Sequence, residues 1–321
     1  MCPAAGRPGD PLIRDPFRPV HRLALATAVL MFGLIVLGSI VRTTGSGLSC
    51  PDWPLCEGRI IPRLQFNVLL EWTHRLVALV VGIGLVTTAG WTLARAELRA
   101  RLGGLAVLAL ALYVTQALLG ALTVWKLLDP GVVGGHLATG LLLFATLLTL
   151  TLVARRESAR ATAASLSARP PGLLAALGAV TALTYAQCVM GGIVSTHHAG
   201  LACAGWPTCN GEWFPRFEGL VALQMTHRVL AYVLAAAMLA TALRLRVAPD
   251  AALRAGAPVA LGLTIAQVVL GVGNVFLGAP PWLSALHLAT ATGILAVMVT
   301  LTHRAATLPA AEPALRLAAA R

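Results

Sequence analysis

The sequence has 321 residues, of which 58% are hydrophobic and 11% are charged, with a mean hydropathy of +0.81. Soluble domains carry about 25% charged residues and disordered chains are poor in apolar residues, so this composition excludes both classes. The formal net charge of +12 does not indicate nucleic-acid binding, because the basic residues lie in short clusters between long apolar runs. We therefore expect a polytopic protein whose surroundings are the lipid bilayer, with no nucleic-acid partner.

Eight apolar stretches are long enough to form membrane-spanning helices, because about 20 residues cross the hydrocarbon core of a bilayer. These stretches are 22–41, 68–94, 103–125, 131–153, 172–195, 219–244, 256–279 and 283–303. The segment 1–21 is rich in proline and arginine and lacks a signal-peptide cleavage pattern, so we expect a flexible basic tail before a retained first span. The sequence therefore predicts an all-α polytopic membrane protein.

The basic residues also predict which side of the membrane each loop faces. Seventeen of the 24 basic residues fall in or beside the two tails and the loops after the second, fourth and sixth spans. Positive charge accumulates on the cytoplasmic side of membrane proteins. We therefore expect a multi-pass protein of the cell (inner) membrane with both termini in the cytoplasm, which agrees with an even number of spans.

The chain contains an internal repeat, which becomes visible when it is shifted against itself. A shift of 153 residues aligns Cys50, Trp53, Pro54, Cys56, Gly58 and Thr73-His74-Arg75 with Cys203, Trp206, Pro207, Cys209, Gly211 and Thr226-His227-Arg228. A shift of 151 residues aligns Gln116, Gly120 and His136-Leu137-Ala138-Thr139 with Gln267, Gly271 and His287-Leu288-Ala289-Thr290. Because each unit holds four spans, the two units share one orientation and form a parallel repeat. We expect two four-helix bundles at 22–154 and 172–304, a cytoplasmic linker at 155–171 and a cytoplasmic tail at 305–321.

Four histidines lie at matching places inside these spans, His74 and His136 in the first unit and His227 and His287 in the second. A histidine inside a span is rare and by default indicates function. The alternative is a histidine that holds helices together by hydrogen bonds, but four matching positions favour a shared role. Two imidazoles on facing helices form a natural axial pair for a haem iron. Zinc is the competing metal, but it usually takes three or four protein ligands, and we find no third intramembrane ligand common to both units.

Arginine and cysteine residues are predicted to accompany each histidine pair on the outer side. Arg75 and Arg228 directly follow a histidine, so each is a candidate for contact with haem propionates, the alternative being a side chain that extends to the membrane interface. Each outer loop also carries a Cys-x5-Cys pair, and cysteines that face an oxidising compartment are expected to form disulfides. Proximity favours pairing within each loop; free thiols and a redox role are the alternatives. The predicted disulfide cysteines are Cys50, Cys56, Cys203 and Cys209, and we expect Cys2 and Cys188 to be unpaired.

The two units differ in charge beside their first histidine. Glu71 lies three residues before His74, on the same helix face, whereas the matching residue before His227 is Gln224. A carboxylate in a span is costly unless it faces a polar cavity or takes part in chemistry. The sequence therefore favours proton-coupled chemistry in the first unit alone. The alternative is a Glu71 that caps or extends from the outer end of its helix.

These residues resemble the heme A synthase family, membrane enzymes that convert heme O to heme A for cytochrome oxidase. The resemblance covers 22–304 and rests on five motifs: residues 42–54 (RTTGSGLSCPDWP), 71–75 (EWTHR), 136–140 (HLATG), 200–207 (GLACAGWP) and 226–228 (THR). It implies that His227 and His287 hold a haem b cofactor and that heme O binds near His74 and His136. It further implies that Glu71 is catalytic and that the C8 methyl of heme O is oxidised to a formyl group through a hydroxymethyl intermediate.

The resemblance also implies an oxidoreductase in which haem b relays electrons, with heme O synthase and cytochrome oxidase assembly factors as candidate partners. No flavin or nicotinamide fingerprint is present in the sequence. Two other functions explain the four histidines equally well: a two-haem b electron-transfer protein that reacts with quinone, and a haem carrier. Neither of them explains the Glu71–Gln224 difference, because a relay or a carrier needs no acid at one site.

Overall fold

The computed structural model describes residues 15–159 and 168–310, and within them eight α-helices are long and apolar enough to cross a membrane. The helices are α1 (Phe17–Thr43), α2 (Phe66–Ala94), α3 (Ala96–Trp125), α4 (Pro130–Ala159), α5 (Leu173–Thr196), α6 (Gly219–Leu245), α7 (Ala251–Phe276) and α8 (Pro281–Thr307). One turn of 3-10 helix, η2 (Ala199–Leu201), follows α5. The predicted all-α polytopic membrane fold is confirmed.

Several helices extend beyond the apolar stretches seen in the sequence. Helix α3 begins at Ala96 instead of 103, and α4 continues to Ala159, inside the predicted linker. Arginine and glutamate are good helix formers, so a helix does not end where its side chains become polar. The C-terminal end of α7, in contrast, comes earlier than the predicted residue 279. Helix α7 ends at Phe276 because Gly278 and Ala279 adopt positive φ angles. The predicted tail up to residue 14, most of the linker and the tail from residue 311 lie outside the described residues.

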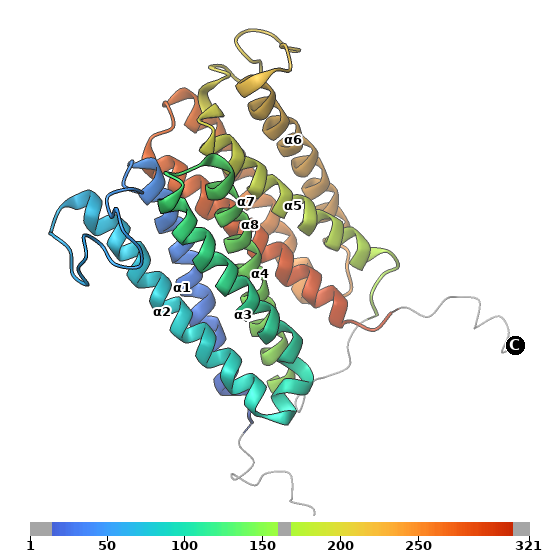
Figure 1. Cartoon of the computed structure of the whole chain (residues 1–321). Helices are drawn as coiled ribbons and strands as arrows, with labels where there is room; N and C mark the ends of the chain where they lie inside the picture. Colours follow the sequence, from blue (N-terminus) through green and yellow to red (C-terminus); the bar gives the residue numbers. More distant parts are fainter. Residues whose placement is uncertain (1–14, 160–167, 311–321) are drawn as a thin grey trace, which may run out of the picture.

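The helices pack as two groups of four (Figure 1). In the first group, α1 and α3 each contact α2 and α4; in the second, α5 and α7 each contact α6 and α8. We call α1–α4 the first unit and α5–α8 the second unit. The contacts between the units are made by α1, α4, α5 and α8, so these four helices form the boundary between the units.

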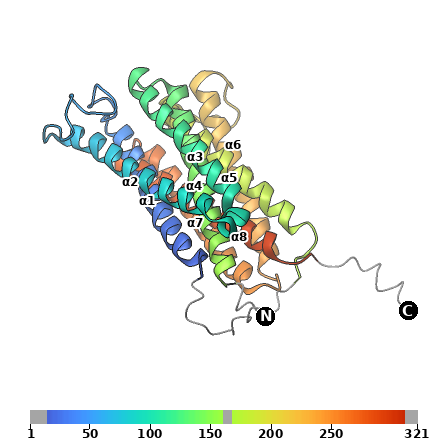
Figure 2. The ribbon, with the colours of Figure 1, turned by 60° about the horizontal axis from the view of Figure 1, so that its bottom comes forward.

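The two ends of the bundle differ in composition. The long loops 44–65 and 197–218 lie at one end, which we call the loop end (Figure 1). The start of α1 and the finish of α8 lie at the opposite end, which we call the terminus end (Figure 2). Apolar side chains fill the terminus end of each unit, among them Leu98, Leu102 and Leu150 in the first and Met238, Leu245 and Leu253 in the second. The histidine-containing spans are therefore closely packed at the terminus end of each unit.

Candidate functional site

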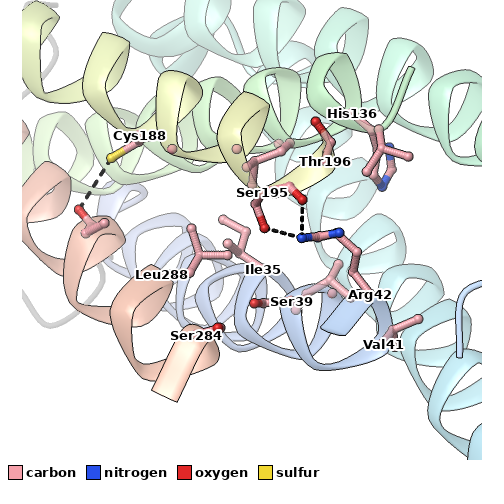
Figure 3. A pocket seen from close by; sticks show the side chains of 18 of the residues that line it. Ile35, Ser39, Val41, Arg42, His136, Cys188, Ser195, Thr196, Ser284 and Leu288 are labelled. Carbon is pink, nitrogen blue, oxygen red and sulfur yellow. Dashed lines mark hydrogen bonds between the residues drawn. The ribbon is translucent and has the colours of Figure 1, made fainter. Parts of the chain in front are cut away.

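One continuous cavity of about 760 Å³ is lined by side chains of both units. Cofactor pockets commonly have volumes of about 300–1,000 Å³, so this cavity is large enough for a sizeable ligand. Figure 3 looks into it between α1, α5 and α8. All of the membrane-embedded residues singled out in the sequence line it: Glu71, His74, Arg75, His136, Gln224, His227, Arg228 and His287.

The four histidines lie at a common depth. His74 and His227 are each eight residues after the first residue of their helix, and His136 and His287 are each six residues after theirs. At 1.5 Å per residue these positions are about 9–12 Å from the loop-end start of each helix. His74 and His136 belong to the first unit and His227 and His287 to the second, so each unit contributes two imidazoles to the cavity.

Each imidazole packs edge-on against a glycine of the preceding helix. A Cβ atom built on Gly38, Gly120, Gly191 or Gly271 would lie 3.0–3.3 Å from the Cε1 atom of His74, His136, His227 or His287, respectively. Such distances are shorter than an ordinary van der Waals contact, so a larger residue would displace the ring. Sequence analysis missed this role, although a shift of 153 residues pairs Gly38 with Gly191 and a shift of 151 pairs Gly120 with Gly271.

Glutamine amides contact three of the four imidazoles. The Nε2 atoms of Gln116 and Gln267 lie 3.3 and 3.1 Å from Nε2 of His136 and His287. Gln187 Nε2 lies 3.1 Å from Nδ1 of His227. The Nδ1 atoms of the other three histidines are buried and have no hydrogen-bond partner in the part of the chain that the structure describes.

These unpartnered ring nitrogens bear on which ligand the site fits. Buried polar atoms are nearly always hydrogen-bonded, so their occurrence at three of four matching positions indicates a site completed by a bound group. Within residues 15–159 and 168–310, no three His, Cys, Asp or Glu side chains come together as a metal-binding group. A pair of imidazoles in a cavity of this size fits a haem iron, whose macrocycle supplies the remaining ligands.

Glu71 is buried, with 4% of its surface exposed, and both of its carboxylate oxygens are bonded. Oε1 lies 2.6 Å from Nη2 of Arg75 in an ion pair, and Oε2 accepts a 2.8 Å hydrogen bond from the backbone N–H of Cys50. The side chain therefore neither caps its own helix nor extends into solvent. Gln224 is equally buried at 5%, but its Oε1 has no partner among the described residues.

Arg75 and Arg228 hold the loops at the mouth of the cavity. Arg75 donates hydrogen bonds to the carbonyl oxygens of Cys50, Asp52 and Leu55, at 3.2, 2.6 and 2.5 Å. Arg228 donates to the carbonyls of Cys203 and Thr208, at 3.0 and 3.1 Å. Both side chains also line the cavity, so contact with a ligand carboxylate stays a prediction for each.

Each loop is closed by a disulfide, Cys50–Cys56 in the first and Cys203–Cys209 in the second. The four half-cystines are buried and pack on the first two turns of α2 and α6. Cys188 is a buried free thiol, and Cys2 lies outside the described residues.

A cross-unit contact that the sequence did not indicate lies at the wall of the cavity. Arg42 of α1 donates from Nη2 to the carbonyl oxygen of Ser195 in α5, at 2.5 Å, and to its hydroxyl (Figure 3). Ser195 is the residue that a shift of 153 pairs with Arg42. A residue reaches its own counterpart only where the two units meet, so Arg42 marks the boundary between them.

Comparison with known proteins agrees with this site. A model of the COX15-CtaA family, described as cytochrome oxidase assembly protein, matches residues 21–299. The heme A synthase of Symbiobacterium thermophilum is 33% identical over 261 residues, which cover 79% of this chain and 85% of the relative. The heme A synthase of Shewanella oneidensis is 30% identical over 318 residues, covering 86% and 94%. That of Methylobacterium sp. is 29% identical over 337 residues, covering 87% and 90%. The resemblance inferred from the sequence motifs is thereby confirmed, and the chain belongs to the COX15-CtaA family of cytochrome oxidase assembly proteins.

Proposed function

We propose that this chain is a heme A synthase, an oxidoreductase that oxidises the C8 methyl of heme O to a formyl group through a hydroxymethyl intermediate. The family match and the heme A synthase relatives support this reaction class. The observation that carries the proposal is the contrast between Glu71 and Gln224, two buried residues at matching places beside otherwise similar histidines.

The two units are proposed to be parallel repeats that each bind one porphyrin. The first unit binds the substrate heme O between His74 and His136, and the second holds a resident haem b between His227 and His287. The two imidazoles in each unit support this assignment, as do the Nδ1 atoms of His74, His136 and His287, which have no partner among the described residues. When bound, haem b supplies electron transfer between an external donor and the first unit.

Glu71 is the proposed proton-exchanging group of the substrate site. Its carboxylate borders the cavity, where it can accept a proton released from the reacting methyl. Arg75 forms an ion pair with this buried side chain, and the Cys50 N–H fixes its orientation. Through their remaining donor positions, Arg75 and Arg228 are candidates for contact with porphyrin propionates.

The loop end is proposed to face the outside of the cell membrane, with both termini in the cytoplasm. The two disulfides support this orientation, because such bonds persist in an oxidising compartment. An impermeant thiol reagent should therefore label Cys50, Cys56, Cys203 and Cys209 in intact cells only after reduction. Heme O synthase and oxidase assembly factors are the proposed partners of the chain in this membrane.

Pigment extraction tests the proposed reaction directly. The chain is co-expressed with a source of heme O, and the extracted porphyrins are separated by chromatography. A synthase yields heme A together with hydroxylated heme O. If the protein is fully loaded with haem and heme O alone accumulates, the chain is an electron-transfer protein or a haem carrier instead.

A further inference from the structure

The two units differ at a second position beside the first histidine of each pair. Gln187 of α5 contacts His227 twice, with Nε2 3.1 Å from the ring Nδ1 and 3.0 Å from the backbone carbonyl oxygen. The residue that a shift of 153 pairs with Gln187 is Leu34 of α1. Leucine offers no hydrogen bond, and His74 Nδ1 has no partner among the residues that the structure describes.

The contrast lies in the side chains, because the neighbouring backbones are placed alike. A Cβ on Gly38 would lie 3.1 Å from Cε1 of His74, and a Cβ on Gly191 would lie 3.0 Å from Cε1 of His227. Helix α1 therefore approaches the His74 ring as α5 approaches the His227 ring. Leu34 and Gln187 each lie four residues before that glycine, and both line the cavity.

A histidine that binds a metal through one ring nitrogen carries a proton on the other, and that N–H needs an acceptor. Gln187 has one in place, since its Oε1 is buried without a partner in the described part of the chain. For Oε1 to accept from Nδ1–H, the amide must turn by half a revolution, give up the Nε2 bond to the His227 carbonyl and shift so that Oε1 lies clear of that oxygen. The ring of His227 then donates from Nδ1 while its Nε2 is free to bind iron.

We propose that Gln187 is a positioning residue that makes His227 a permanent haem ligand, and that Leu34 leaves His74 without this bond so that the first unit exchanges its porphyrin. The inference rests on the proposed function, because it assumes a resident porphyrin in the second unit and a transient one in the first. It explains how two similar histidine pairs serve as a cofactor site and a substrate site.

The first test uses the purified holoprotein and follows transfer of its haem to apomyoglobin. Loss of a hydrogen bond to a ligating histidine lowers metal affinity about 10–100-fold, so Gln187→Leu should release haem faster by that factor. The reduction potential of the haem should rise as well, because a histidine without an acceptor is a weaker electron donor to iron. The substitution is compatible with folding at this place, since leucine is the residue found at the matching position.

Two further variants separate hydrogen bonding from packing. Gln187→Glu keeps an acceptor oxygen, so it should retain haem as well as the unaltered protein and lower its potential. Thr184→Val changes a polar residue one turn away on α5 whose hydroxyl is bonded to the Val180 carbonyl, and it should alter neither property. Wild-type haem release in Gln187→Leu, or fast release in Gln187→Glu, would overturn the proposal. Retention of haem in His227→Ala would instead refute the assignment of the second unit.

The reverse substitution tests the first unit. Leu34→Gln should give His74 its missing partner, and purified protein titrated with heme O should then bind it about 10–100-fold more tightly. Binding is followed by absorbance, without turnover. Unchanged affinity would refute the part of the proposal that concerns the substrate site.

Discussion

The two units share the parts that would hold a porphyrin. Each has two histidines, two glycines against which the rings pack, a glutamine beside its second histidine and a disulfide-closed loop held by an arginine. All of these features recur after a shift of 151 or 153 residues. The two units therefore share the arrangement of residues that would contact a porphyrin.

Several positions that line the cavity differ between the two units. Among them are Glu71 against Gln224, Leu34 against Gln187 and Arg42 against Ser195. Each lines the cavity, and none alters a helix boundary. Under the proposed assignment, a repeated scaffold acquires two functions through a few side chains that face a common cavity.

The histidine substitutions should have the largest effect. Changing both His227 and His287 to alanine removes the proposed iron ligands, so the haem b proposed for the second unit should be lost entirely. His74→Ala or His136→Ala should keep that haem but abolish turnover. Optical spectra of purified protein report the haem, and pigment extraction reports the product. An intact low-spin b-type spectrum in the double variant would refute the assignment of the two units.

Glu71→Gln should reduce turnover by about two orders of magnitude or more, which is the contribution of a well-placed acid or base. Glutamine retains an acceptor for the Cys50 N–H but loses the titratable group and the ion pair with Arg75. The Cys50–Cys56 loop and the resident haem should survive, as checked by spectra and by thiol titration.

The reverse change provides the matched control. Gln224→Glu should not create a second active site, because the haem proposed for the second unit is a resident cofactor that is not exchanged for heme O. A Glu71→Gln variant with near wild-type conversion of heme O would show that Glu71 only anchors the loop.

A glycine substitution should have a moderate effect. Gly191→Ala places a methyl 3.0 Å from Cε1 of His227, and such overpacking commonly costs about 1–3 kcal/mol. Haem content should fall and the electron paramagnetic resonance spectrum of the remaining haem should shift. Gly178→Ala is the control on the same helix, since nothing lies within 4 Å of its added methyl. Equal haem loss in both variants would indicate a general effect on α5.

The fold was predictable because each span is long and apolar enough to be recognised by itself. The internal repeat gives each span a counterpart in the other unit, which supports the same assignment. The histidines were found because an imidazole in a span is chemically unusual. Helix ends were less predictable, as at Ala96 and Ala159, because polar helix formers continue a helix beyond the apolar stretch.

The contacts within the site were not predictable from pattern alone. Gly38 and Gln187 are common residue types in such helices, and their significance depends on which ring lies opposite. The bond from the Cys50 N–H to Glu71 joins residues 21 apart through a loop path that no periodicity describes. Arg42 belongs to a motif that the sequence reveals, but its partner Ser195 lies 153 residues away in the other unit.

The smallest expected effect is a difference in pH dependence between the two loops. In the first loop, Asp52 accepts hydrogen bonds from the N–H groups of Gly58 and Glu57, at 2.8 and 2.6 Å. The Gly58 bond, followed by the Glu57 bond, holds the pKa of the Asp52 carboxyl below its usual value. In the second loop the residue matching Asp52 is Gly205, and the neutral side chain of Asn210 bonds to Ala204 N–H and the Ala202 carbonyl instead.

A carboxyl whose pKa is lowered by folding stabilises the folded loop at pH values above its unfolded pKa of about 3.9. That stabilisation is lost as the pH falls through the lower folded pKa, whereas an asparagine does not titrate. Acidification below about pH 4 should therefore reduce hydrogen-exchange protection at Glu57 and Gly58 but leave Ala204 unchanged, once intrinsic exchange rates are divided out. Asp52→Asn should remove this pH dependence while keeping acceptor capacity for one of the two N–H groups. The same acid sensitivity in both loops would mean that the effect arises from the bundle as a whole and not from Asp52.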